Sequence, residues 1–130
     1  MNSTESAKIL VAEDNRVMGN VMKFNLERSG FIVVLVHDGQ TAIRQLEQDE
    51  FDIVITDYQM PHASGEDVCR HVRFDSAHQQ MPVILVSAKG IELNTEELTG
   101  PGGFSRIVYK PFSPREIVRI IGEVLDPVTA

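Results

Sequence analysis

Short runs of apolar residues, many of them β-branched, recur along the chain and are separated by longer segments with helical periodicity. The runs occupy residues 8–12, 31–36, 51–56, 82–87 and 104–109. Each run is too short for a helix and is apolar at consecutive positions, which is typical of strands buried on both faces of a parallel sheet. The pattern therefore predicts five buried parallel strands.

The segment after the first run predicts the first helix. Its apolar stripe consists of Val17, Val21 and Phe24, with Met18 and Met22 beside it. Residues at this spacing share one side of a helix and form the apolar face of an amphipathic segment. Gly30 follows at the position where a glycine commonly ends a helix. We expect a helix that ends just before this glycine.

Three further helices are predicted by their start signals and apolar stripes. Asp38 and Ser64 can cap the second and third helices. The last helix has the best start signal in the chain, with Ser113 as N-cap, Pro114 at the first helical position and Glu116 closing a capping box. The residues expected to face inward are Ala42, Ile43 and Leu46, then Val68, Cys69 and Val72, and finally Ile117, Ile120, Ile121, Val124 and Leu125.

Strands that alternate with helices at this spacing imply right-handed βαβ units. We predict an α/β fold, a flavodoxin-like, doubly wound, five-stranded parallel sheet in the order 2-1-3-4-5 with helices on both faces. Only a short stretch between residues 90 and 103, from about 94 to 99, has helical character, because a proline and several glycines follow it. The fourth helix is therefore expected to be short or mobile. A length of 130 residues fits a single domain over 1–130, with a core from about 7 to 126.

The composition argues against disulfide-stabilised and membrane-spanning classes of protein. A hydrophobic content of 42% suffices for a core, and Cys69 is the only cysteine, which excludes a disulfide framework and fits a reducing compartment. The longest apolar run, residues 31–36, is far shorter than the roughly 20 residues of a membrane-spanning helix. The first residues lack the apolar stretch of a signal peptide. We expect no membrane insertion and a cytoplasmic location.

The formal net charge is −7, from 19 acidic and 12 basic residues. Such a balance repels phosphate backbones and anionic lipids at long range, so we expect no direct binding of nucleic acid. Solubility alone is a sufficient explanation of an acidic excess. Only the placement of the acidic residues adds information about function.

Polar residues stand where the predicted strands end. Glu13 and Asp14 follow the first strand, and Asp57 follows the third. Ser87 ends the fourth strand, and Lys110 follows the fifth. Because the carboxyl ends of parallel strands share one edge, where ligands bind at the point of strand-order reversal, these side chains are expected to converge. Three carboxylates so close repel one another unless a cation lies among them, and oxygen ligands favour Mg²⁺.

The same residues suit a phosphoryl group. Lys110 would place an ammonium beside the carboxylates and Ser87 a hydroxyl donor, which with Mg²⁺ would neutralise the phosphoryl oxygens. Asp57 would be the nucleophile that attacks phosphorus and becomes an acyl phosphate. The function predicted from these residues is phosphoryl transfer onto the protein itself.

Each of these residues also has a simpler explanation when it is taken alone. Glu13 and Asp14 could cap the first helix, and Asp57 could belong to a turn. Ser87 could be structural, and Lys110 could be a solvated surface charge. The convergence of all five on one edge of the predicted sheet favours the joint site.

Four motifs, in order and over nearly the whole chain, resemble those of the receiver domain of bacterial two-component response regulators. They are Ile9-Leu10-Val11-Ala12-Glu13-Asp14-Asn15, Asp57-Tyr58-Gln59-Met60-Pro61 with Gly65 after it, Val86-Ser87-Ala88, and Lys110-Pro111-Phe112. The resemblance implies a signalling switch of a two-component system or phosphorelay and not an enzyme, apart from Mg²⁺-dependent self-phosphorylation and slow autodephosphorylation of Asp57. The donor would be a histidine of a sensor histidine kinase or of a histidine phosphotransfer protein. A downstream protein or output domain would read the face formed by the fourth helix, the fifth strand and the last helix.

The resemblance also implies roles for single residues. The ligands of Mg²⁺ would be Asp14, Asp57 and the main-chain carbonyl of Gln59, with Glu13 acting largely through water. Lys110 would pair with the phosphoryl oxygens, and Ser87 would swing in to bond them after transfer. The bond between Lys110 and Pro111 is usually cis in this family, which aims the lysine inward.

Some positions depart from the family pattern or stand at its variable points. Receivers commonly carry an aromatic residue three positions before the lysine, and Ile107 stands there instead. Tyr109 could substitute for it, although we favour a core position for its side chain. Gln59 and Lys89 stand at the mouth of the expected pocket, where family members tune the lifetime of the acyl phosphate.

Two other functions are compatible with part of the sequence pattern. A phosphatase with an aspartate nucleophile also uses Mg²⁺ on a similar sheet, but it usually carries an Asp-x-Asp motif after the first strand, which is absent here. An interaction module that needs no phosphorylation is compatible with a short fourth helix, but the complete set of pocket residues argues against it. Without a DNA-binding or enzymatic output domain, the chain is expected to be a stand-alone receiver or one excised from a longer protein.

Overall fold

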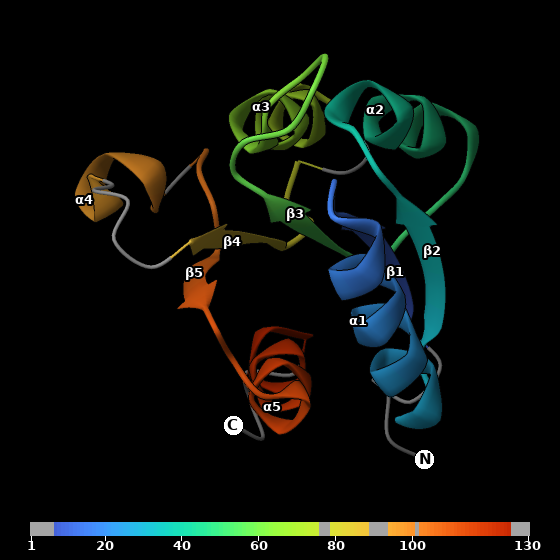
Figure 1. Ribbon diagram of the computed structural model, residues 1–130. Helices are drawn as coiled ribbons and strands as arrows, with labels where there is room; N and C mark the ends of the chain where they lie inside the picture. Colours follow the sequence, from blue (N-terminus) through green and yellow to red (C-terminus); the bar gives the residue numbers. More distant parts are fainter. Residues whose placement is uncertain (1–6, 76–78, 89–93, 101, 126–130) are drawn as a thin grey trace.

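The computed structural model describes residues 7–75, 79–88, 94–100 and 102–125. The strands are β1 (Lys8–Ala12), β2 (Ile32–Val36), β3 (Ile53–Asp57), β4 (Val83–Ala88) and β5 (Arg106–Lys110). The helices are α1 (Arg16–Arg28), α2 (Gly39–Gln48), α3 (Gly65–Phe74), α4 (Thr95–Leu98) and α5 (Pro114–Leu125). The strands form one parallel sheet in the order β2-β1-β3-β4-β5 (Figure 1). The predicted α/β fold and strand order are confirmed; β1 has the predicted bounds, and the bounds of the other strands differ from the prediction by at most two residues.

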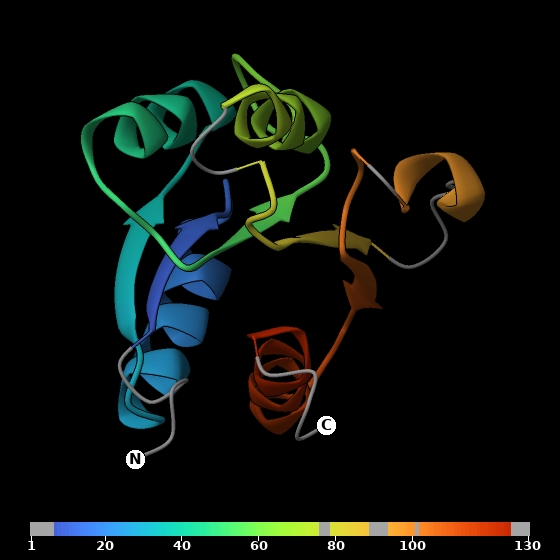
Figure 2. The same ribbon diagram turned by 180° about the vertical axis from the view of Figure 1, so that it is seen from behind.

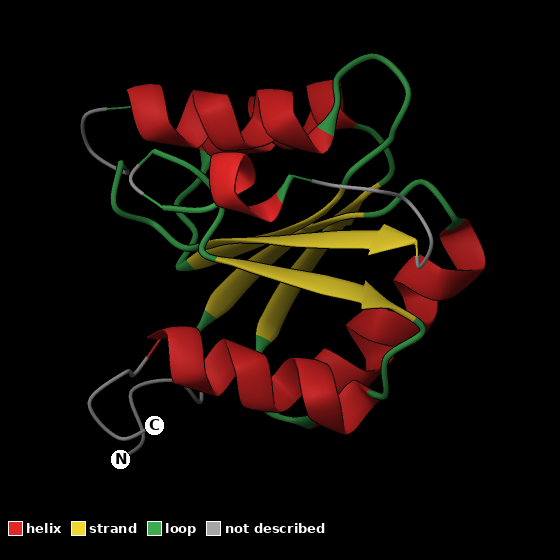
Figure 3. Cartoon of the chain, turned by 90° about the vertical axis from the view of Figure 1, so that its left-hand side faces the viewer, coloured by secondary structure: helices red, strands yellow, loops and turns green. Residues whose placement is uncertain are grey.

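Helices cover both faces of the sheet. Figures 1 and 2 show α2 and α3 on one side of the sheet and α1 and α5 on the other, and Figure 3 shows the same three layers in a side view. Alternate residues of each strand serve the two cores: Ile9 and Val11 pack with α1 and α5, whereas Leu10 and Ala12 pack with α2 and α3. Because both faces are covered, most positions of the central strands β1, β3 and β4 are apolar, and the exceptions are Lys8, Thr56, Asp57 and Ser87.

The helix starts follow the predicted caps. The Asp38 side chain accepts a hydrogen bond from the Thr41 main-chain nitrogen at 2.7 Å. Ser64 forms a complete capping box with Asp67 at the start of α3. At the start of α5, Ser113 Oγ accepts from the Glu116 nitrogen at 3.2 Å, which is the first half of the predicted box. Each cap satisfies main-chain donors that the first turn of a helix leaves free.

The apolar stripe that predicts α1 does not face the sheet. Val17 is 73% exposed and Phe24 58% exposed, and Val21 is exposed as well. The helix instead buries Gly19, Met22 and Leu26. The stripe of Val17, Val21 and Phe24 is therefore not the side of α1 that packs on the sheet. Periodicity shows that one side of a helix is apolar, but it does not show what covers that side.

Helix α4 is a single turn, as the sequence predicts. It begins after its N-cap Asn94 and ends before Thr99, and Leu98 packs against the core on the α2–α3 face. Residues 89–93 and 101, next to this turn, lie outside the described residues. The expectation that this segment is mobile stays a prediction. None of the helices in the described ranges is long and apolar enough to cross a membrane.

Candidate functional site

Three carboxylates meet at the carboxyl edge of the sheet. Glu13 and Asp14 follow β1, Asp57 ends β3, and one carboxylate oxygen of each lies within 4.8 Å of those of the other two. Strands β1 and β3 are neighbours, but β2 follows β1 in the chain, so strand order reverses here. This is the position at which doubly wound sheets bind their ligands. The convergence expected of these three carboxylates is observed.

Glu13 is buried and firmly held, with 2% of its surface exposed. Its main-chain nitrogen donates to the Val36 carbonyl at 3.0 Å, and its carboxylate accepts from the Asn15 nitrogen at 3.2 Å. The Nδ1 atom of His37 lies 2.9 Å from the Glu13 carbonyl oxygen. His37 was not predicted as part of the site, although it follows β2 and so stands at the same edge of the sheet as the acids.

The cap of α1 decides between two explanations of the acid pair. The Asn15 side chain accepts the hydrogen bond from the Met18 nitrogen at 3.0 Å and is the N-cap. Glu13 and Asp14 precede this cap and do not perform its role. The explanation of these two acids as helix caps is therefore wrong, and both carboxylates are left for the site.

Lys110 joins the carboxylates from β5. Its Nζ lies 2.8 Å from Glu13 Oε1 and 3.4 Å from Asp57 Oδ2, and 17% of its side chain is exposed. The bond from Lys110 to Pro111 is cis, as the resemblance implies. Burial alone would lower the pKa of Lys110, but the hydrogen bond and charge of Glu13, with those of Asp57, outweigh it and raise the pKa. Lys110 is thus a fixed ammonium and not a solvated surface charge.

The charges around Asp57 do not balance. Its pKa is raised to about 7, first by burial and then by the neighbouring Glu13 and Asp14, while Lys110 opposes the shift. One ammonium therefore does not compensate three carboxylates. An oxygen-only cluster with surplus negative charge suits a hard divalent cation such as Mg²⁺, so the residues present fit this ion.

Ser87 contributes a buried hydroxyl without a partner. The residue is 1% exposed in β4, one strand away from Asp57, and its Oγ has no hydrogen-bond partner among the described residues. A buried hydroxyl that bonds nothing costs free energy, and such groups are rare in folded proteins. The Ser87 hydroxyl is therefore free to donate a hydrogen bond to an additional acceptor atom.

The loop after β3 is packed against the start of α3. A residue with a side chain does not fit at the position of Gly65, because its Cβ would lie 2.3 Å from the Asp57 carbonyl oxygen. The Gly65 nitrogen donates to the Tyr58 carbonyl at 2.9 Å. Gln59, which the sequence predicts at the pocket mouth, follows Tyr58 and is exposed. Lys89, the other residue expected there, lies outside the described residues.

The two residues considered for aromatic signalling differ in environment. Ile107 is half-buried and packs against the core on the α2–α3 face. Tyr109 is 39% exposed, so the interpretation of its side chain as a core position is wrong. Strand β5 lies at the edge of the sheet, where the helix layer beyond it consists of one turn, α4, and this leaves the residue open to solvent.

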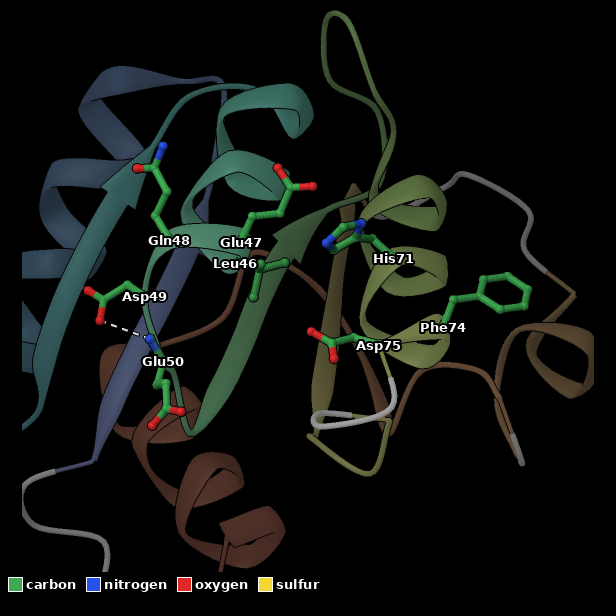
Figure 4. A pocket seen from close by; sticks show the side chains of 8 residues that line it. All are labelled: Leu46, Glu47, Gln48, Asp49, Glu50, His71, Phe74 and Asp75. Carbon is green, nitrogen blue, oxygen red and sulfur yellow. Dashed lines mark hydrogen bonds between the residues drawn. The ribbon is translucent and has the colours of Figure 1, made fainter.

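A further hollow lies away from this site. Its volume is about 550 Å³, and Figure 4 shows it between the last turns of α2 and α3, with His71 and the exposed Phe74 on one side. Both helices run antiparallel to the strands, so these turns lie at the amino edge of the sheet, away from Asp57. The hollow takes no part in the site described above.

The fold and the site together define a class of protein: a doubly wound α/β domain with an acidic, lysine-containing pocket at its topological switch point. A family model of the response regulator receiver domain matches residues 9–122. The chain therefore belongs to the response regulator receiver domain family and takes part in two-component signalling. Members of this family are typically phosphorylated switches and not classical enzymes.

Solved structures of receiver domains match nearly the whole chain. One is the receiver domain of a sensor histidine kinase from Pseudomonas aeruginosa, with a magnesium ion coordinated in its active site cleft. It has a TM-score of 0.82 and 28% identity and covers 92% of this chain and 98% of that one. A receiver domain protein from Clostridium thermocellum has a TM-score of 0.81 and 28% identity, over 95% and 97% of the two chains. A chemotaxis response regulator of Vibrio cholerae, at 23% identity, has a TM-score of 0.84 over 92% and 99% and shows the fold alone.

Proposed function

We propose that this protein is a phosphoacceptor switch in which Asp57 receives a phosphoryl group from a phosphohistidine. The observation that carries the proposal is the meeting of Glu13, Asp14 and Asp57 within 4.8 Å, with one ammonium beside them and a buried, unpartnered hydroxyl on the neighbouring strand β4. Each group by itself is ordinary. Together they supply a nucleophile, a cation site and donors for phosphoryl oxygens.

The transfer needs no other protein group to form a bond. A carboxylate oxygen of Asp57 attacks phosphorus, and the bond from phosphorus to the donor imidazole nitrogen breaks as the new P–O bond forms. The electron pair leaves with the imidazole, which takes a proton from solvent. Lys110, 3.4 Å from Asp57 Oδ2, is placed to pair with the phosphoryl oxygens. The Ser87 hydroxyl, which bonds no described residue, can donate to the same oxygens.

Mg²⁺ would be held by Asp14, Asp57 and the main-chain carbonyl of Gln59, with Glu13 acting largely through water. When bound, the ion supplies positive charge for the phosphoryl oxygens during transfer. The fit rests on three carboxylates that face one ammonium, in a site where burial and then the neighbouring Glu13 and Asp14 raise the pKa of Asp57 to about 7. The related kinase receiver with magnesium in its cleft supports the same assignment.

The donor is proposed to be a sensor histidine kinase or a histidine phosphotransfer protein that docks on α1. Val17 and Val21 are exposed apolar residues, and they line a hollow of about 220 Å³ between α1 and α5 together with Lys110 and Pro111. The hollow thus connects the apolar surface of α1 to the lysine of the pocket. A protein seated on α1 would bring its phosphohistidine toward Asp57.

The output surface is proposed to be the face of α4, β5 and α5, read by a downstream protein or output domain. Phosphorylation would shift an existing equilibrium between two conformations of this face. Helix α4 is only one turn, so it adds little area to that face. The downstream partner is therefore proposed to be one that fits a face with a short α4. Residues 1–130 are proposed to form a single receiver domain, of which the family model matches 9–122.

Incubation with acetyl phosphate and Mg²⁺, followed by intact-mass measurement, tests the proposal. We expect one phosphoryl adduct per chain, none in Asp57→Asn and none with EDTA. Asp52→Asn is the matched control, because Asp52 precedes β3 at the other edge of the sheet and bonds the Lys8 nitrogen there. Turnover of many phosphate esters per chain would favour a phosphatase. The lack of any adduct would favour an interaction module that works without phosphorylation.

A further inference from the structure

Tyr58 connects the phosphoacceptor strand to α3 through both its main chain and its side chain. Its nitrogen donates to Val86 O and to Asp57 Oδ1, each at 3.1 Å, which ties it to β4 and to the phosphoacceptor itself. Its carbonyl accepts from the Gly65 nitrogen at 2.9 Å. The loop from 58 to 65 is therefore closed on itself at its base.

The side chain closes the loop a second time. Successive residues of a strand point to opposite faces, so the Tyr58 ring lies away from the acidic pocket and packs half-buried on the α2–α3 face. There its hydroxyl donates to Glu66 Oε1 at 2.8 Å. Glu66 stands in the first turn of α3, directly after Gly65. A hydrogen bond to a carboxylate is stronger than one between neutral groups, so this contact is a firm anchor.

We propose that Tyr58 is a positioning residue for the magnesium site, acting through its hydroxyl on Glu66. Through the Tyr58 nitrogen, which donates to Asp57 Oδ1, the anchor holds the orientation of the Asp57 carboxylate. It also limits rotation of the next peptide, which joins Gln59 to Met60 and carries the Gln59 carbonyl. Without the anchor this peptide can rotate at little cost, because Gln59 is exposed and has no described hydrogen bond. The inference rests on the proposed function, since it concerns the same cation site.

Tyr58 would contribute to the affinity for Mg²⁺ without being a ligand of the ion. Groups that orient metal ligands commonly change metal affinity by about 10- to 100-fold when they are removed. Tyr58 also keeps its main-chain bonds in a Tyr58→Phe variant, so a smaller effect is expected. We expect the dissociation constant for Mg²⁺ to rise by about threefold to tenfold.

Isothermal titration calorimetry with MgCl₂ on the full chain tests this. The matched control is Tyr109→Phe, because Tyr109 is the only other tyrosine and is exposed on β5. Native chain and Tyr109→Phe should bind Mg²⁺ equally, and Tyr58→Phe more weakly. Urea unfolding of each variant without Mg²⁺ establishes that it is folded under the conditions of the titration.

The conservative pair at Glu66 separates positioning from charge. Glu66→Gln keeps an oxygen that accepts from Tyr58, so its affinity for Mg²⁺ should stay close to native. Glu66→Ala removes the acceptor and should match Tyr58→Phe. Equal affinity in native chain and Tyr58→Phe would overturn the inference, and so would a Glu66→Gln variant as weak as Glu66→Ala. No Mg²⁺ binding by the native chain would instead overturn the proposed function itself.

Discussion

Asp57 is placed among groups that disfavour its negative charge. Burial and the adjoining carboxylates raise its pKa from 3.8 to about 7, although Lys110 lies within reach. The folded protein therefore binds a proton at Asp57 over a range in which the unfolded chain has released it. The stability that this proton provides is lost as pH rises from about 4 through about 7, unless a cation replaces it.

A stability measurement at two pH values checks this balance. In EDTA at pH 8, Asp57→Asn should be more stable than the native chain by about 2 kcal/mol, because the amide removes the crowded charge. The difference should shrink toward zero near pH 4 and should also shrink when Mg²⁺ is added at pH 8. Urea unfolding measures it. A native chain as stable as the variant at pH 8 would contradict the charge balance described above.

Ser87 allows a second test at the scale of one residue. Its buried hydroxyl bonds no described group, so Ser87→Ala should leave the free energy of unfolding unchanged or raise it by up to about 1 kcal/mol. Ser64 is the comparison, because its hydroxyl has a defined role as the N-cap of α3. Ser64→Ala should lower the free energy of unfolding by about 1 kcal/mol. Urea denaturation compares the two. A loss for Ser87→Ala as large as that for Ser64→Ala would mean that the Ser87 hydroxyl is already engaged.

At the scale of single elements, the sequence predicts strands and caps better than the face that a helix buries. The strands are apolar at consecutive positions because both their faces are covered, and Asp38 and Ser64 cap their helices as expected. In α1 the predicted stripe is exposed, because the helix packs on the sheet through Gly19, Met22 and Leu26. A single sequence does not distinguish an apolar face that meets the core from one that meets a partner.

Two substitutions in α1 check this assignment. Leu26→Ala should cost about 3 kcal/mol, because Leu26 is fully buried and its removal leaves a cavity. Phe24→Ala should cost less than about 1 kcal/mol, because the ring is exposed and is contacted by Arg28, whose guanidinium carbon lies 5.7 Å from the ring centroid. Thermal or urea unfolding ranks them. The opposite order would show that the original stripe faces the core.

At the scale of the whole molecule, topology brings distant residues together. Lys110 and Glu13 are 97 positions apart, yet β1 and β5 end at the same edge and the two side chains lie 2.8 Å apart. The sequence predicts this convergence because strand order and direction follow from alternating elements. His37 and the Tyr58–Glu66 contact were not predicted, since they depend on side-chain directions in loops that no periodic pattern encodes.

The exposed apolar face of α1 should affect the rate of phosphoryl transfer from a protein donor but not from a small-molecule donor such as acetyl phosphate. Val21→Asp is expected to slow phosphoryl transfer from a phosphorylated histidine phosphotransfer protein at least about tenfold, since a charge in an apolar contact is costly to bury. It should leave modification by acetyl phosphate unchanged. Ile32→Asp is the control, because Ile32 is similarly exposed but lies on β2, outside the hollow between α1 and α5. Equal transfer rates in Val21→Asp and the native chain would show that the donor protein does not dock on this face of α1.

The dependence of the acetyl phosphate adduct on free Mg²⁺, followed by mass spectrometry of the peptide that carries it, tests the central claim most directly. The acidic cluster with its lysine is predicted to yield an adduct on the peptide containing Asp57, with a yield that rises with Mg²⁺ to saturation and falls to nothing in EDTA. An adduct of equal yield in EDTA, or one on a peptide without Asp57, would contradict the account.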